Sequence, residues 1–220
     1  MILIGYTIQE ADRLGEPVKR FLGRVADEAF AVSGAYQEFE SVLDGYERDT
    51  GIGLHESLVS DLVKLSDILD DHPGEPVEKV LDLAGIIGNE RDHVSQLVNN
   101  LMTGVKDTND CGRILRECLF RWESVVARRR SELRNRIPRW EPTDLAEVAR
   151  VEEALLNKWP GGGSWKRDSK IFAQTHSRAC KDDVVFVTED INHYGKRRET
   201  LLSMTKVREI ENLNGDPITR

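Results

Sequence analysis

The chain is poor in cysteine and has no long apolar run. Only three of its 220 residues are cysteine, and Cys111, Cys118 and Cys180 form no C-x-x-C pair. This spacing argues against a disulfide framework and a zinc site, and it favours a reducing compartment. No stretch approaches the ~18 uninterrupted apolar residues of a membrane span, and no basic lead precedes an apolar segment at the N-terminus. We therefore predict a cytoplasmic protein with no signal peptide and no membrane association.

Charge is unevenly distributed along the chain. The net charge of −8 disfavours a polyanionic partner, yet residues 111–140 hold nine arginines against three glutamates. A local basic face matters more than the global sum when the partner is nucleic acid. Two interpretations stay open. The arginines, with Phe120, Trp122 and Trp140 among them, form a track for RNA, or they pair with the acidic residues 41–110 while the aromatic rings join the core.

Apolar periodicity places strands at the two ends of the chain and helices between them. Strands are predicted over residues 2–7, 29–33, 184–188 and 206–210. Helices are predicted over 16–26, 35–48, 54–69, 75–102, 110–136, 144–158, 168–181 and 195–203. This order predicts an α/β core formed by residues 1–48 plus 159–220, with a helical insertion over residues 49–158.

Three carboxylates occupy equivalent places in the predicted α/β units. Glu38 lies in the helix after strand 29–33, Asp168 opens the helix before strand 184–188, and Asp190 follows that strand. All three are expected at the carboxyl edge of one parallel sheet, where such folds bind ligands. Two carboxylates ~4 Å apart repel by roughly 4 kcal/mol at an effective dielectric near 20, so a shared Mg²⁺ or Mn²⁺ ion is predicted. Taken singly, Asp168 and Asp190 also suit helix caps or turns, and Glu38 suits a solvated helix position.

These residues resemble the PIN-domain family, the PilT N-terminus nucleases. Its late motif is matched by Asp168, Ile171 and Ala173, then a strand, then Thr188-Glu189-Asp190; the segment from Ser33 to Glu38 matches its earlier acid. The resemblance covers about residues 1–48 and 165–212. It implies a three-layer α/β/α sandwich around a small parallel sheet, and Mg²⁺- or Mn²⁺-dependent cleavage of RNA. Members include toxin ribonucleases, so an antitoxin or another protein partner and a homodimer are among the implied assemblies.

The resemblance also implies roles for individual residues. Glu38, Asp168 and Asp190 are the expected catalytic and metal-binding carboxylates. Asn192 stands where the family often has a further acid, and it is expected to bind the metal without adding charge. The residues expected to bind the substrate are Thr188, Lys196, Arg197 and Arg198.

The front of the chain departs from the family pattern. The family begins with a strand that ends in a catalytic aspartate, whereas this chain starts at Met1-Ile2-Leu3-Ile4. Losing a central strand exposes unpaired backbone on its neighbours, so we expect the natural start codon to lie upstream. The alternative is that residues 2–6 form the strand and one ligand is missing. A scaffold that binds RNA or a protein without cleaving it is then the competing function.

Overall fold

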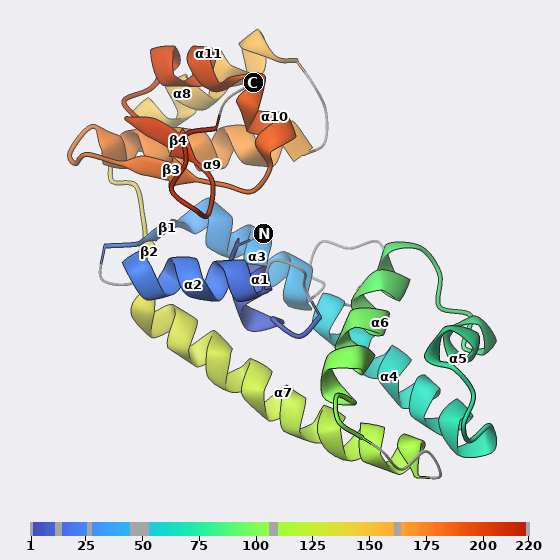
Figure 1. Cartoon of the computed structure of the whole chain (residues 1–220). Coiled ribbons are helices and arrows are strands. Elements are labelled where there is room, and N and C mark those ends of the chain that lie inside the picture. The colour runs from blue at the N-terminus through green and yellow to red at the C-terminus, as the bar shows by residue number, and fades with distance from the viewer. Residues whose placement is uncertain are drawn as a thin grey trace. The chain divides into compact units, whose positions relative to one another are not determined.

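The structure is a computed structural model that describes residues 2–11, 15–25, 28–44, 53–105, 110–160 and 164–218. Within these ranges the chain is mostly helical, with four short strands (Figure 1). The elements are α1 (Ile2–Thr7), α2 (Gly15–Val25), β1 (Ala31–Val32), α3 (Ser33–Asp44), α4 (Leu54–Asp71), α5 (Val77–Leu83), α6 (Gly88–Leu101), α7 (Cys111–Arg136), β2 (Arg139–Trp140), α8 (Leu145–Lys158), α9 (Ser164–Ala179), β3 (Val185–Val187), α10 (Ile191–Gly195), α11 (Arg198–Met204) and β4 (Glu209–Glu211). None of these helices has the length and apolar character needed to cross a membrane.

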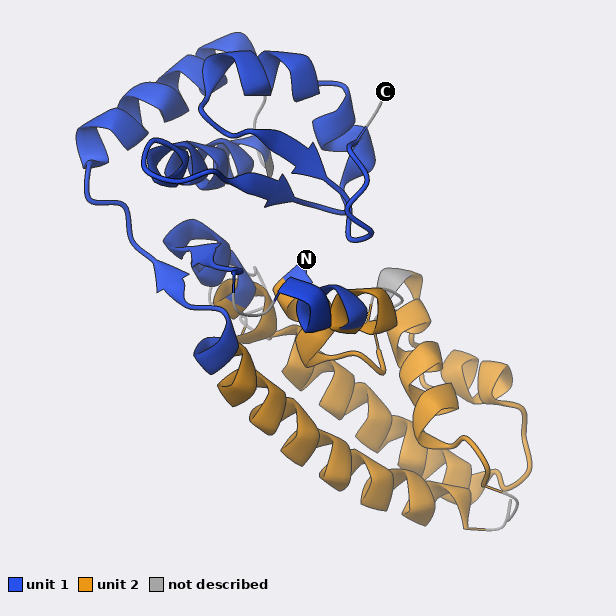
Figure 2. Ribbon diagram, turned by 60° about the vertical axis from the view of Figure 1, so that its left-hand side comes forward, with its two compact units in different colours: residues 1–2, 20–39, 134–220 blue, residues 3–19, 40–133 orange. Residues whose placement is uncertain are grey.

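The chain divides into two compact units (Figure 2). Unit 1 comprises residues 1–2, 20–39 and 134–220, and unit 2 comprises residues 3–19 and 40–133. The sequence prediction placed 134–158 in the helical insertion, yet this segment, with β2 and α8, falls in unit 1. Residues 3–19, predicted to belong to the α/β core, fall in unit 2.

Unit 1 contains two pairs of parallel strands. β1 pairs with β2, with Ala31 opposite Arg139, and β3 pairs with β4, with Phe186 opposite Ile210. The far edge of β4 is covered by the chain end, because the Ile218 N–H donates to the Ile210 carbonyl at 2.9 Å. Helices with short parallel strands agree with a mixed α/β class. The described strands form two separate pairs, so the single covered sheet of a three-layer sandwich is not shown.

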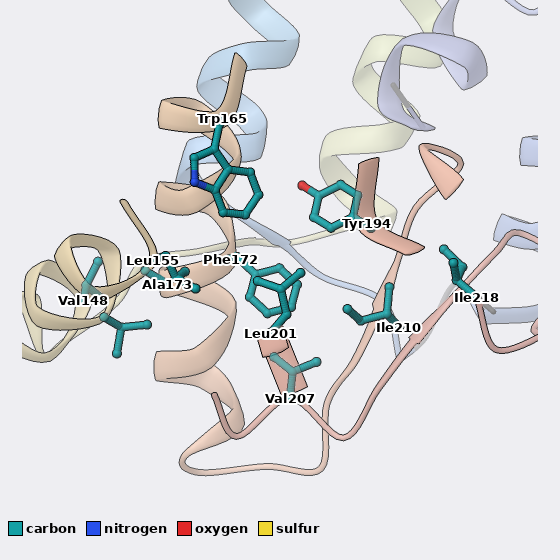
Figure 3. Packing of buried hydrophobic residues seen from close by; sticks show 11 residues of the cluster. Val148, Leu155, Trp165, Phe172, Ala173, Tyr194, Leu201, Val207, Ile210 and Ile218 are labelled. Carbon is teal, nitrogen blue, oxygen red and sulfur yellow. The ribbon is translucent and has the colours of Figure 1, made fainter. Parts of the chain in front are cut away.

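The core of unit 1 lies between α8, α9 and the β3–β4 pair. Val148 and Leu155 of α8 pack in one buried cluster with Phe172 of α9 (Figure 3). The Phe172 ring is fully buried, with its centroid 4.9 Å from that of Phe186 and 6.1 Å from that of Tyr194. Since Phe172 lies one helical turn after Asp168 and Tyr194 belongs to α10, this core fixes α9 and α10 side by side.

Unit 2 is a helical assembly. α4 packs against α5 and α6, and its apolar stripe of Leu58, Leu62 and Leu65 is buried. The predicted helix 75–102 is wrong in one respect, because it is divided into α5 and α6. Gly85 and Gly88 have φ values of 70° and 67°, a backbone conformation outside the right-handed helix that glycine adopts at little cost.

The N-terminal segment differs most from the sequence prediction. Residues 2–7 were predicted as a strand, but they form α1, in which Leu3, Ile4 and Tyr6 are buried. A short continuous apolar run suits a buried helix as well as a buried strand, and burial on most sides of α1 selects the helix here. The alternative in which residues 2–6 supply the missing strand is therefore wrong. The expected ends of helices 16–26 and 35–48, beyond Val25 and Asp44, lie outside the described residues.

Candidate functional site

Asp168 lies in the second turn of α9 and is contacted by two side chains of α10. The Tyr194 hydroxyl donates a hydrogen bond to Asp168 Oδ1 at 3.1 Å. His193 Nε2 lies 3.3 Å from Asp168 Oδ2, and the Asp168 side chain is 20% exposed. The predicted helix start at Asp168 is wrong, because α9 begins at Ser164. Asp168 is consequently an interior helix residue that faces α10, and the helix-cap interpretation does not apply to it.

The charges of the other two predicted carboxylates, Glu38 and Asp190, act on Asp168. Burial raises the pKa of Asp168, and the negative charges of Glu38 and Asp190 raise it further, while His193 and Tyr194 oppose this rise. Burial also raises the pKa of Tyr194 well above its usual value, and the charges of the same three carboxylates add to that effect. Acids from three separate segments therefore share one electrostatic environment. Asp190 is exposed, so this environment is open to solvent on one side.

Glu38 is carried by α3, whose first turn is attached to α9. The Gly34 N–H donates to Gln174 Oε1 at 2.8 Å, and Gln174 Nε2 donates to Ser33 Oγ at 3.1 Å. Because β1 leads directly into α3, these bonds also fix the end of the strand. Sequence reasoning did not find Gln174, since a glutamine inside a helix gives no signal of a long-range contact.

Asp190 also has a structural role. Its Oδ1 accepts a hydrogen bond from the His193 N–H at 3.0 Å, which makes it the N-cap of α10. Its own N–H donates to Thr188 Oγ1 at 3.1 Å, so the Thr188 hydroxyl is used in the turn between β3 and α10. The cap that the sequence offered as an alternative for Asp190 is thus formed, and it holds this carboxylate at the end of β3.

Two tryptophans and Arg197, which come from three different segments, lie around His193. The Trp165 ring centroid lies 5.2 Å from that of His193, and Arg197 Cζ lies 4.8 Å from the Trp165 ring and 5.6 Å from the Trp159 ring. Arg197 Nη1 donates to the His193 carbonyl at 2.9 Å. The guanidinium that the sequence assigned to substrate binding is therefore held by aromatic faces inside the unit. His193 and the tryptophans were missed as site residues.

The remaining predicted site residues differ in exposure. Arg198 Nε and Nη2 donate to Glu209 Oε1 at 3.0 and 2.6 Å, so this arginine ties α11 to β4. Lys196 and Asn192 are exposed. Within the predicted basic group, Lys196 is consequently more exposed than Arg197 and Arg198.

The arginine-rich helix α7 is largely paired with acids of unit 2. Arg129 Nη1 and Nη2 donate to the two oxygens of Glu10 at 2.6 and 2.7 Å, and Arg130 binds Asp44 in the same two-pronged way at 2.9 and 2.7 Å. Trp122 is buried, whereas Phe120 is 74% exposed. These contacts favour the structural interpretation for Arg129, Arg130 and Trp122.

The acids suit a hard divalent cation by their chemistry. Carboxylate oxygen is the ligand that Mg²⁺ and Mn²⁺ prefer, and crowding of negative charge at Asp168 favours a bound cation. In the described part of the chain, however, no group of three or more His, Cys, Asp or Glu side chains is placed to hold a metal ion. Both oxygens of Asp168 face α10 side chains. The carboxylate oxygens are therefore the right kind of ligand for Mg²⁺ or Mn²⁺, but the three side chains are not arranged around one metal position.

No protein-family model, curated protein or solved structure matches this chain.

Proposed function

We propose that the protein is a metal-dependent, PIN-like nuclease that hydrolyses RNA phosphodiester bonds, with a PIN-like sandwich as its fold. One observation carries this proposal: a half-buried Asp168 shares its electrostatic environment with Glu38 and Asp190, which come from distant segments. Burying several carboxylates together costs free energy unless a bound cation or a reacting group compensates their negative charge. Such clusters occur where a site binds cations or reacts with phosphate esters.

Glu38, Asp168, Asp190 and the exposed Asn192 are the residues that would hold Mg²⁺ or Mn²⁺. When bound by carboxylates, such an ion supplies Lewis acidity and a lowered pKa for water. The chain's own contribution is orientation, because the Tyr194 hydroxyl donates to one oxygen of Asp168 and the His193 ring lies next to the other. Lys196 would neutralise the phosphate of the substrate.

We propose Arg197, Arg198 and Thr188 as residues that shape the substrate side of the site through their internal contacts. Arg197 sets the position of His193, Arg198 anchors α11, and Thr188 shapes the turn before Asp190. The three cysteines are free, and we propose that the protein acts in the cytoplasm. RNA is the proposed partner, with an antitoxin-like protein or a second copy of the chain as the proposed assembly.

A second candidate is a PIN-like scaffold that binds RNA or a protein without cleaving it. It is favoured because no group of acids within the described ranges is placed as a metal shell. It is also favoured by α1, which is a helix where the family pattern calls for a strand with an aspartate.

A metal titration of thermal stability separates the two functions. A ligand that binds only the folded state at 100 times its dissociation constant stabilises it by about 2.7 kcal/mol. We expect Mn²⁺ to raise the melting temperature of the wild type and to activate RNA cleavage. Asp168→Asn should remove both effects, whereas the matched control Asp183→Asn, an acid 65% exposed and paired with Arg208, should retain them. A wild type that shows no Mn²⁺ response would contradict the nuclease and leave the scaffold.

A further inference from the structure

His55 is a titratable side chain of unit 2 that lies in the first turn of α4. Its ring centroid is 5.4 Å from that of Trp122, a buried residue of α7. His55 Nε2 is buried and has no hydrogen-bond partner among the residues that the structure describes. A neutral ring nitrogen can occupy such a place at modest cost, whereas a protonated ring would bury an N–H of a charged group without an acceptor. The packed position therefore suits the neutral form of His55.

The start of α4 packs closely against the end of α3. A Cβ atom at Gly53 would collide with the Leu43 carbonyl oxygen, so glycine is needed for this approach. Leu58, about one turn beyond His55 in α4, is buried. Water can consequently reach the inner ring nitrogen of His55 only if the ring or the start of α4 moves.

The charged groups around His55 come from three helices. Asp44 at the end of α3 accepts two hydrogen bonds from Arg130 of α7, at 2.9 and 2.7 Å. The other two groups are Glu123 of α7 and the exposed Glu56 of α4 itself. Because His55 Nε2 has no partner within the described ranges, none of these acids binds it. Asp44 is already paired, so a protonated ring would add a second positive charge near Arg130.

Burial lowers the pKa of His55 below its ordinary value of 6.5, and the positive charge of Arg130 acts in the same direction. The negative charges of Glu123, Asp44 and Glu56 oppose this effect without cancelling it. The N-terminal end of a helix carries partial positive charge, which also disfavours a charged ring there. Above pH 6.5 the ring is neutral in the folded and in the unfolded chain. Below that pH an open or unfolded chain binds the proton more readily than the packed form, so acid favours opening.

We propose that His55 is a pH-sensitive switch of unit 2, in which protonation of the ring releases the start of α4 from α7. In the packed form the neutral ring lies on Trp122, and in the open form the protonated ring is hydrated. One proton is linked to the opening, so the ratio of open to packed chains rises by at most about tenfold for each pH unit below 6.5. The switch lies outside the candidate site and does not depend on the proposed function.

Amide hydrogen exchange of the full chain tests the switch. The reporter is the Ser57 N–H, which donates to the Gly53 carbonyl at 2.9 Å in the packed start of α4. The opening equilibrium constant is obtained by NMR at pH 6.5 and one pH unit lower, after correction for the intrinsic exchange rate at each pH. We expect it to rise severalfold in the wild type, toward the limit of about tenfold. Glu10, whose pKa lies below its ordinary value of 4.5, stays ionised throughout this range, so its ion pair with Arg129 adds no pH dependence.

Variants that cannot titrate assign the effect to the ring. His55→Phe keeps an aromatic ring for Trp122 but binds no proton, so its opening constant should be the same at both pH values. His55→Gln is a second neutral variant, which replaces it if the larger Phe ring disturbs the fold. His72→Gln is the matched control, because His72 is exposed at the other end of α4. This control should show the same rise as the wild type.

Three results would overturn the switch. The first is an equal rise of the opening constant in the wild type and in the neutral variants. The second is a titration of the His55 ring, followed by ¹H NMR, with a pKa at or above 6.5. The third is a lowered pKa of His55 with no rise in opening, since the ring then takes up its proton without releasing α4. None of these results bears on RNA cleavage, because no group of the candidate site takes part.

Discussion

Replacing Glu10 by alanine should destabilise unit 2 strongly. The Glu10 carboxylate accepts three hydrogen bonds, two from Arg129 and one from Trp122 Nε1 at 3.0 Å. The side chains of Glu10 and Arg129 are 27% and 14% exposed, so removal of the carboxylate leaves a largely buried cation without its partner. Breaking such a pair costs about 3 kcal/mol, which corresponds to a fall in melting temperature of about 6 to 12 °C for a chain of this size.

The pH dependence of this loss has a definite sign. Burial raises the pKa of Glu10, but the hydrogen bonds and charge of Arg129 outweigh it and lower the pKa below the ordinary value of 4.5. A carboxyl with a lowered folded pKa contributes stability above its unfolded pKa and loses it as the pH falls through the folded value. The wild type and Glu10→Ala should therefore differ fully at neutral pH, and the difference should shrink as the pH falls below 4.5.

Urea denaturation followed by circular dichroism at 222 nm measures the loss of unfolding free energy. An RNA-binding assay below the melting temperature then tests whether Arg129 contacts RNA. If Arg129 is structural, Arg129→Met should lower stability and leave RNA binding unchanged. A loss below about 1 kcal/mol for Glu10→Ala, the range of an exposed ion pair, would refute the reasoning. An Arg129→Met variant that keeps wild-type stability but no longer binds RNA would also refute it. That result would favour the alternative in which the arginines of α7 bind RNA.

Three further predictions concern the core and the site. Phe172→Ala should lower the free energy of unfolding by about 3–5 kcal/mol, because it leaves a cavity at a fully buried position of α9 that faces α8 and β3. A loss below about 1 kcal/mol in urea denaturation would contradict this packing. Without metal, Asp168→Asn should raise the melting temperature near neutral pH, because the raised pKa means that the ionised carboxylate destabilises the fold. That gain in stability should vanish below pH 3.8, the ordinary pKa of the group. An Asn variant less stable than the wild type at neutral pH would contradict the repulsion between negative charges at Asp168. Phe120→Ser should change the free energy of unfolding by less than about 0.5 kcal/mol, since the ring is 74% exposed. A larger loss of stability in thermal melts would show that the ring packs against the protein.

Long amphipathic segments were predictable from the sequence. The helices over 54–69, 110–136 and 144–158 correspond to α4, α7 and α8 with small differences at their ends. Helical periodicity is local, so residues within one turn of each other suffice to reveal it. The strand predicted over 184–188 corresponds to β3. A short valine-rich run between turn residues favours a strand, because β-branched side chains pack well on a sheet.

Chain order within the predicted α/β units was the basis for expecting Glu38, Asp168 and Asp190 at one sheet edge. In the structure Asp168 lies inside α9 and not at its start, and the described strands form two separate pairs, so that single edge is not shown. Chain order gives no information on Gln174, His193 or Tyr194, whose partners are contacts across elements. Arg197 was assigned to substrate by its charge, although its surroundings of two tryptophan rings hold it inside the unit.

The sequence by itself determined where the long helices lie, because helical periodicity is a short-range pattern. Tertiary structure decided that residues 2–7 are helical and that α7 uses Arg129 and Arg130 for ion pairs. It also decided that a glutamine of α9 holds the start of α3. The physical reason is that an apolar run, an arginine or a glutamine satisfies several environments equally well, and only its distant neighbours select one of them.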